Sequence, residues 1–182
     1  MSGRRDPSGD APSAPVGATP AAATDAPSPA EDALVRIGER FGGTVRFTRQ
    51  EILHFADLAH DRNPMHHDDR AANASRFGGL IASGTQATAV MMGMFATHFT
   101  RRDDGVARAA LGMDFAMQLR APVRPDQDVR IEWEVVEREW KPRHRGWVVT
   151  GRATARTVTH TGQDQVAIEM RGVGLVMPAD RI

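Results

Sequence analysis

The chain has 182 residues, enough for one domain and a tail. Lysine plus arginine and aspartate plus glutamate each number 23, so no net charge attracts nucleic acid or an anionic membrane. The absence of cysteine excludes disulfides, thiolate metal sites and thiol nucleophiles, and fits a reducing compartment. No apolar run reaches the roughly 18 residues of a membrane-spanning helix, and no apolar segment follows the Arg4–Arg5 pair as an export signal requires. We therefore expect a soluble, cytoplasmic protein with no nucleic-acid or membrane partner.

Residues 1–30 are expected to form a disordered tail. From residue 7 onward they are almost entirely Pro, Ala, Ser, Gly, Thr and Asp. Such a segment buries too little apolar surface to offset a backbone ordering cost of about 1–2 kcal/mol per residue. The folded domain is therefore predicted to cover residues 31–182.

A short strand and then a helix beginning at Thr48 are predicted next. Thr48 followed by Glu51 matches a capping box, which marks a helix start. The helix should end within 61–64, because proline disfavours helical geometry in the residue before it. His54 and His60 are placed on this helix and interpreted as structural residues.

A second helix is predicted from Gly84 to about Phe99. Ser83, with Gln86 three residues later, matches another capping box and makes Ser83 the N-cap. The residues that follow are apolar nearly all round, so this helix should be buried on most sides. At roughly 16 residues it is too short to span a membrane.

The C-terminal part of the chain has the pattern of β structure. Apolar and polar residues alternate strictly over 129–137 and more weakly over 147–157, and the apolar segment 166–176 follows. Successive strands at this spacing indicate an antiparallel sheet. A long buried helix with one such sheet predicts an α+β fold in which the sheet curls around the helix. The three tryptophans are interpreted as packing residues, and the cationic segment 140–146 as a hairpin turn, with phosphate contact as the alternative.

The stretch HDRNPMHHDD, residues 60–69, contains the groups that a proton-transfer site needs. Asp61 and His66 flank Asn63 and a stiffening Pro64, so both side chains can face one cavity. There, a carboxylate and an imidazole that share a water can take its proton and return one to carbon. The alternative left open is that Asp61 caps the next short helix and His66 is a loop histidine. A metal site is not expected, because adjacent histidines and aspartates rarely converge on one ion without distant partners.

Gly84 offers a second chemical group, its main-chain N–H. As the first residue of the helix it has no acceptor within the helix, and no side chain blocks an approaching carbonyl. The positive end of the helix dipole then stabilises charge on that oxygen, which is worth roughly 10²–10³ in rate. The alternative is that glycine only permits a sharp turn into the helix.

The segment FADLAHDRNPMHHDDRAANASRFGGLIASG, residues 55–84, resembles the hydratase motif of MaoC-like dehydratases and (R)-specific enoyl-CoA hydratases. The shared features are an acid, Asn-Pro, a histidine five residues after the acid, a Phe-Gly, and an Ile-Ala-x-Gly that opens a buried helix. The resemblance implies a single hot-dog domain, with FAMQLRAPVRPDQDV as the strand and turn after the helix. It makes Asp61 and His66 the catalytic pair and places Asn63, Ser83 and Gly84 at the substrate, with the Gly84 amide on the thioester carbonyl.

The same resemblance implies an activity and an assembly. The reaction is reversible hydration of a trans-2-enoyl thioester to an (R)-3-hydroxyacyl thioester, without a cofactor beyond the CoA or carrier protein attached to the substrate. The assembly is a homodimer or a higher homo-oligomer, with the acyl tunnel at the interface. Two departures stand out: many relatives have histidine at the position of Ser83, and Met92 occupies the place of a serine that assists the acid in some hydratases.

Two other functions remain open on the same fold. One is thioester hydrolysis, for which hot-dog thioesterases usually place an acid on the central helix. Residues 85–99 contain no Asp or Glu, which argues against it. The other is a non-catalytic acyl-thioester-binding protein, against which the intact Asp61 and His66 pair argues.

Overall fold

The computed structural model describes residues 26–158 and 162–181, so the predicted tail lies outside the described residues as far as residue 25. The helical segments are α1 (Pro29–Asp32), α2 (Arg49–Leu58), η1 (Pro64–His66), α3 (Asp69–Ala74), α4 (Gly84–Thr100), η2 (Pro142–His144) and η3 (Ala179–Arg181). The strands are β1 (Arg40–Arg46), β2 (Arg108–Leu119), β3 (Asp128–Lys141), β4 (Gly146–Val158) and β5 (Asp164–Pro178).

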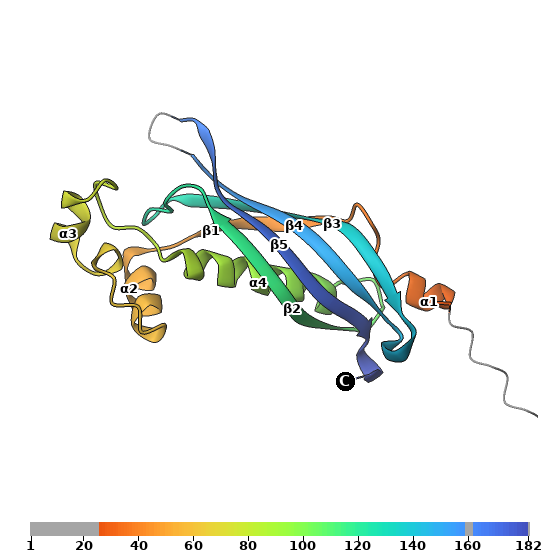
Figure 1. The fold of residues 1–182 in the computed structure, drawn as a ribbon. Coiled ribbons are helices and arrows are strands. Elements are labelled where there is room, and N and C mark those ends of the chain that lie inside the picture. Colours follow the sequence, from red (N-terminus) through yellow and green to blue (C-terminus); the bar gives the residue numbers. More distant parts are fainter. Residues whose placement is uncertain (1–25, 159–161, 182) are drawn as a thin grey trace, which may run out of the picture.

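The strands form one sheet in the order β1-β3-β4-β5-β2, and every neighbouring pair is antiparallel. Helix α4 lies along one face of this sheet, while α2 and α3 lie beyond one of its ends (Figure 1). The predicted α+β architecture, an antiparallel sheet around a long central helix, is confirmed. Strands β1 and β2 are the two edges of the sheet.

Local sequence signals explain the start of α2 but not its end. The predicted capping box is confirmed, because the Thr48 side chain accepts from the Glu51 N–H and the Glu51 carboxylate accepts from the Thr48 N–H. The helix ends at Leu58, earlier than predicted. His60 therefore lies beyond the helix, with a left-handed φ of 54°, and its predicted position on the helix is wrong. His54 is helical and exposed, as expected of a structural residue.

The core lies between α4 and the sheet. The predicted inward-facing residues of β3 are at most 1% exposed: Val129, Ile131, Trp133 and Val135. The Trp133 indole N–H donates to the Met91 carbonyl of α4 at 3.1 Å, and the Trp133 and Phe95 rings lie 5.1 Å apart. A Cβ at Gly151 would lie 2.9 Å from the Phe95 ring, so glycine allows this close approach and interrupts the alternation in β4.

Helix α4 starts at Gly84 as predicted, but it is buried on one face only. Met91 and Phe95 are buried against the sheet, whereas Ala89 and Gly93 are exposed. The prediction of burial on most sides is therefore wrong for the single chain, because its sheet covers one side of the helix. Among the described residues no helix is both long and apolar enough to cross a bilayer.

The turn between β3 and β4 holds the N-terminal segment, at the end of the sheet away from α2 and α3 (Figure 1). Arg145 donates to both carboxylate oxygens of Glu31 at 2.5 and 2.7 Å, and the Trp147 indole N–H donates to the Glu31 carbonyl at 2.7 Å. Burial opposes ionisation of Glu31, but hydrogen bonds from Ser28 and Arg145 outweigh it and lower the Glu31 pKa to about 2. The segment 140–146 is thus a hairpin turn with a structural role.

Candidate active site

The C-terminal end of α2 positions Asp61. The Asp61 N–H bonds to the Ala56 carbonyl at 2.8 Å and the His60 N–H to the Asp57 carbonyl at 3.1 Å, the paired bonds of a Schellman motif. One carboxylate oxygen of Asp61, Oδ1, accepts from the Asn63 N–H at 3.0 Å. The backbone therefore fixes this carboxylate and leaves its second oxygen, Oδ2, for other partners.

Asn63, and not Asp61, caps the next short helix. Its side-chain oxygen accepts from the Met65 N–H at 3.1 Å, and Pro64 occupies the first position of η1. The alternative in which Asp61 serves as this cap is therefore wrong. Asn63 shapes the turn that carries the chain from Asp61 to His66.

His66 is buried and held by the main chain. Its Nδ1 lies 2.8 Å from the Ile81 carbonyl oxygen, and because a carbonyl only accepts, Nδ1 carries the hydrogen. Its other nitrogen, Nε2, lies 3.5 Å from Asp61 Oδ2. The His66 side chain is 8% exposed and that of Asp61 is 31% exposed, so the carboxylate is the more open of the two. The structure thus brings together the two residues predicted to form a pair.

Ser83 is the N-cap residue of α4, as predicted, but its side chain does not cap the helix. Its Oγ lies 2.7 Å from Thr85 Oγ1 and 3.4 Å from Asp61 Oδ2. Gln86, the expected capping-box partner, instead donates from its side-chain amide to the Glu51 carbonyl at 3.2 Å. The predicted capping box is wrong: the Ser83 side chain accepts from no main-chain N–H of α4, and its nearest partner is the Thr85 hydroxyl.

Gly84 follows Ser83 directly and carries the first N–H of α4. Within the described residues this N–H has no main-chain acceptor. A Cβ at Gly84 would lie 2.4 Å from Leu119 Cδ1, so the end of β2 borders the beginning of α4. The acid, the imidazole and the helix start therefore belong to one cluster, joined through the Ser83 hydroxyl.

The sequence pattern did not predict two further polar groups in this cluster, the side chains of His67 and Thr85. His67 Nε2 lies 2.6 Å from the Asp61 carbonyl oxygen, where it ties down the loop. The spacing around His67 gave no sign of this main-chain contact; in the part of the chain that the structure describes, no three His, Cys, Asp or Glu side chains gather around a possible ion. For Thr85, nothing in the spacing marks a contact with Ser83.

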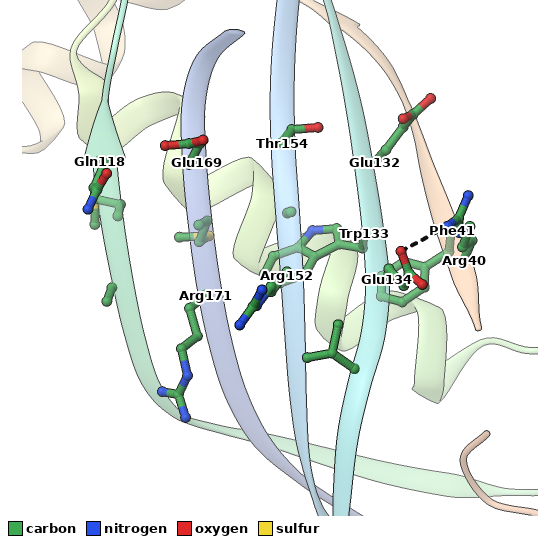
Figure 2. Close-up of a pocket in the computed structure, with 15 residues that line it drawn as sticks. Arg40, Phe41, Gln118, Glu132, Trp133, Glu134, Arg152, Thr154, Glu169 and Arg171 are labelled. Carbon is green, nitrogen blue, oxygen red and sulfur yellow. Dashed lines mark hydrogen bonds and ion pairs between the residues drawn. The ribbon is translucent and has the colours of Figure 1, made fainter. Parts of the chain in front are cut away.

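In the part of the chain that the structure describes, a larger and a smaller cavity lie outside this cluster. The larger, of about 1170 Å³, crosses β3, β4 and β5, where Figure 2 shows Glu132, Arg152 and Arg171. Three arginines and three glutamates line it, so it offers no net charge to attract a phosphate. The smaller, of about 250 Å³, lies between α4 and β2 and is lined by Met92, Gly93, Phe95, Ala96, Ala110, Leu111, Gly112 and Phe115. Its apolar lining suits hydrocarbon, and it borders the exposed side of α4.

Comparison with solved structures shows which fold this is. The chain is similar to a protein described as a monoamine oxidase regulatory protein from Archaeoglobus, with TM-score 0.65, 23% identity, and 80% of this chain and 92% of that one covered. It is also similar to a MaoC-like dehydratase from Rhodospirillum rubrum, with TM-score 0.62, 25% identity and coverage of 79% and 94%. An (R)-hydratase from A. caviae, described as involved in PHA biosynthesis, gives TM-score 0.60, 20% identity and coverage of 79% and 97%. The sheet around α4 is therefore a hot-dog fold.

The family follows from the sequence match. Residues 35–157, more than half of the chain, match the family model described as a MaoC like domain. This protein therefore belongs to the MaoC-like domain family, as the motif around Asp61 indicated. Comparison with curated protein sequences gives no significant match.

Proposed function

We propose that this protein catalyses the reversible hydration of a trans-2-enoyl thioester to an (R)-3-hydroxyacyl thioester. The observation that carries the proposal is the approach of His66 Nε2 to Asp61 Oδ2 at 3.5 Å, beside the beginning of α4. Membership of the MaoC-like family supports it, as does the fold shared with the solved (R)-hydratase.

Each group has a role in the proposed reaction. The Gly84 N–H and the α4 dipole stabilise negative charge on the thioester carbonyl oxygen, which makes the β-carbon electrophilic. Asp61 and His66 hold the water, and Asp61 accepts its proton as the water oxygen bonds to the β-carbon. The α-carbon then takes a proton from the acid–imidazole pair, with His66 assisting, so the site returns to its starting state. The π bond of the C=C double bond and one O–H bond of the water break, and one C–O and one C–H bond form.

The proposed reaction needs no cofactor, because it consists of proton transfers and one addition to carbon. CoA or a carrier protein enters only as part of the substrate. Of the residues expected near the substrate, Gly84 binds the carbonyl, Asn63 maintains the loop, and Ser83 contacts Asp61. A cytoplasmic location stays a prediction.

A homodimer formed through β2 is the assembly that we propose. β2 is an edge strand that pairs with β5 on one side only, and it exposes the large apolar side chains Leu111, Met113, Met117 and Leu119. Exposed apolar edges are rarely left uncovered, since they pair with other chains. Because Leu119 touches the beginning of α4, a second copy on this edge also encloses the site.

No observation favours thioester hydrolysis over hydration. Helix α4, Gly84–Thr100, contains no Asp or Glu that could face a bound thioester. Hydrolysis has its own readout, the release of free thiol from an acyl-CoA, so the same assay mixture separates the two reactions. A non-catalytic acyl-thioester binder would show neither reaction.

The test is the loss of enoyl-thioester absorbance with a panel of enoyl-CoA substrates. Asp61→Asn and His66→Ala should each abolish turnover while the protein remains folded by circular dichroism. His54→Ala is the control, because this side chain is exposed on the neighbouring helix and should leave turnover unchanged. Turnover at the wild-type rate in either site variant would exclude the assigned roles.

A further inference from the structure

The hydroxyl of Thr85 lies at the outer end of a short hydrogen-bonded chain that reaches Asp61. Thr85 Oγ1 lies 2.7 Å from Ser83 Oγ, and Ser83 Oγ lies 3.4 Å from Asp61 Oδ2. Ser83 is 4% exposed, whereas Thr85 is exposed at the beginning of α4. The buried hydroxyl thus joins an accessible one to the carboxylate.

Each hydroxyl has only one hydrogen to donate, and this determines which residue donates and which accepts along the chain of hydrogen bonds. An ionised carboxylate only accepts, so the single Ser83 hydrogen points to Asp61. The Ser83 oxygen then has lone pairs free to accept, and the nearest donor is the Thr85 hydroxyl at 2.7 Å. The order is therefore Thr85 to Ser83 to Asp61, and hydroxyls that act in series strengthen one another.

The position of Ser83 makes this arrangement possible. A serine at an N-cap usually accepts from a main-chain N–H of the first helical turn, but the Ser83 side chain makes no such bond. Thr88 does not compete for Thr85, because its own hydroxyl bonds back to the Gly84 and Thr85 carbonyls. The two hydroxyls are left to each other and to Asp61.

We infer that Thr85 is a positioning residue, which orients the Ser83 hydroxyl so that it donates to Asp61 and holds this carboxylate toward His66. The inference rests on the proposed hydration, in which Asp61 takes and returns a proton. When Asp61 is protonated, both hydroxyls rotate and the chain runs the other way, so one pair of side chains serves both states. Neither Ser83 nor Thr85 touches the reacting carbon in this scheme.

Kinetics of four variants test the inference. Thr85→Val, which keeps the shape and removes the hydroxyl, should lower kcat about 3–10-fold with little change in KM, and Ser83→Ala should lower it about 10–100-fold. The acidic limb of the rate–pH profile should move to higher pH in both. Thr85→Ser should restore the wild-type profile, and Thr97→Val, on the exposed side of the same helix, should not alter it.

The order of action gives a sharper test. Because Thr85 acts through Ser83, the double variant should be no slower than Ser83→Ala alone. A wild-type kcat and pH profile in Thr85→Val, or losses that multiply in the double variant, would overturn the inference. A wild type without hydratase activity would instead overturn the proposed function.

A stability measurement tests the chain of hydroxyls without any activity. Thr85→Val should lower the urea midpoint more in the wild type than in the Asp61→Asn background, because only the wild type has a charged end acceptor. Equal shifts in the two backgrounds would overturn the link between Thr85 and Asp61.

Discussion

The Nδ1 hydrogen of His66 is donated to the carbonyl oxygen of Ile81, 2.8 Å away, which ties the turn after α2 to the segment that leads into α4. This bond orients the ring so that Nε2 lies 3.5 Å from Asp61 Oδ2. Because Nδ1 is occupied, Nε2 is the nitrogen available to a bound water. The main chain therefore determines which edge of the imidazole serves the site.

Two substitutions at His66 should distinguish the structural role of Nδ1 from the catalytic role of Nε2. In His66→Asn the side-chain amide can still donate to the Ile81 carbonyl, but the group equivalent to Nε2 is lost. We expect near-normal stability with hydration reduced at least about 100-fold. His66→Ala leaves the Ile81 carbonyl without its partner and should also reduce the free energy of unfolding by about 1–3 kcal/mol. Urea unfolding measures the stability of each variant, and initial rates measure its hydration activity. Equal stability of the two variants would contradict the role assigned to Nδ1.

Gly84→Ala should impair catalysis more than folding. The added Cβ would lie 2.4 Å from Leu119 Cδ1, but this atom is the far end of a flexible side chain, which can turn away. The same methyl would crowd a carbonyl approaching the Gly84 N–H, so we expect a roughly 10–100-fold loss in kcat/KM.

Gly93→Ala is the matched control on the same helix. A Cβ at Gly93 meets nothing within 4 Å, so alanine should raise the free energy of unfolding by about 0.5–1 kcal/mol through its better helix propensity. Turnover of a short-chain substrate should persist. If both glycine variants lost activity to the same extent, the special role of the Gly84 amide would be contradicted.

Charges on the β2 edge should disrupt the proposed dimer. Met113 and Met117 are 61% and 39% exposed in the single chain, and we expect Met113→Lys combined with Met117→Lys to give a monomer in size-exclusion chromatography with light scattering. The hydration rate should decrease when the dimer is lost, although Asp61 and His66 are unchanged. Ile37→Lys, at a residue 62% exposed in the N-terminal segment, should leave the mass unchanged. A double lysine variant that stays dimeric would place the interface elsewhere.

The ion pair of Glu31 should make part of the stability depend on pH. Its pKa is about 2 in the folded protein against an ordinary value of 4.5, so its contribution is complete above 4.5 and is lost as the pH falls toward 2. Glu31→Gln should therefore destabilise by roughly 2 kcal/mol at about pH 7 and by much less at about pH 3. Urea unfolding at several pH values measures the difference. Glu132→Gln, at a side chain 67% exposed, should have little effect on the free energy of unfolding at any pH. A destabilisation by Glu31→Gln that becomes larger at acid pH would contradict the stabilising role of the Glu31 ion pair.

Local sequence patterns predicted the structure correctly where the interacting residues lie close together in the sequence. The start of α2 was predicted from Thr48 and Glu51, which bond to each other within one helical turn. The inward face of β3 was predicted from alternation, because side chains on a strand point alternately to its two sides. Alternation did not reveal strand β2, since its unpaired edge exposes apolar residues and a bulge between Gly112 and Asp114 interrupts its register.

The sequence by itself determined where α2 and α4 begin, the antiparallel sheet and the motif that brings Asp61 and His66 into one short loop. Tertiary structure decided how these residues are used. Ser83 lies 22 positions from Asp61, and only the packing of α4 beside the end of α2 brings its hydroxyl within 3.4 Å of the carboxylate. The physical reason is that a side-chain hydrogen bond needs its two groups within about 3 Å, and residues distant in sequence come so close only when the chain is folded.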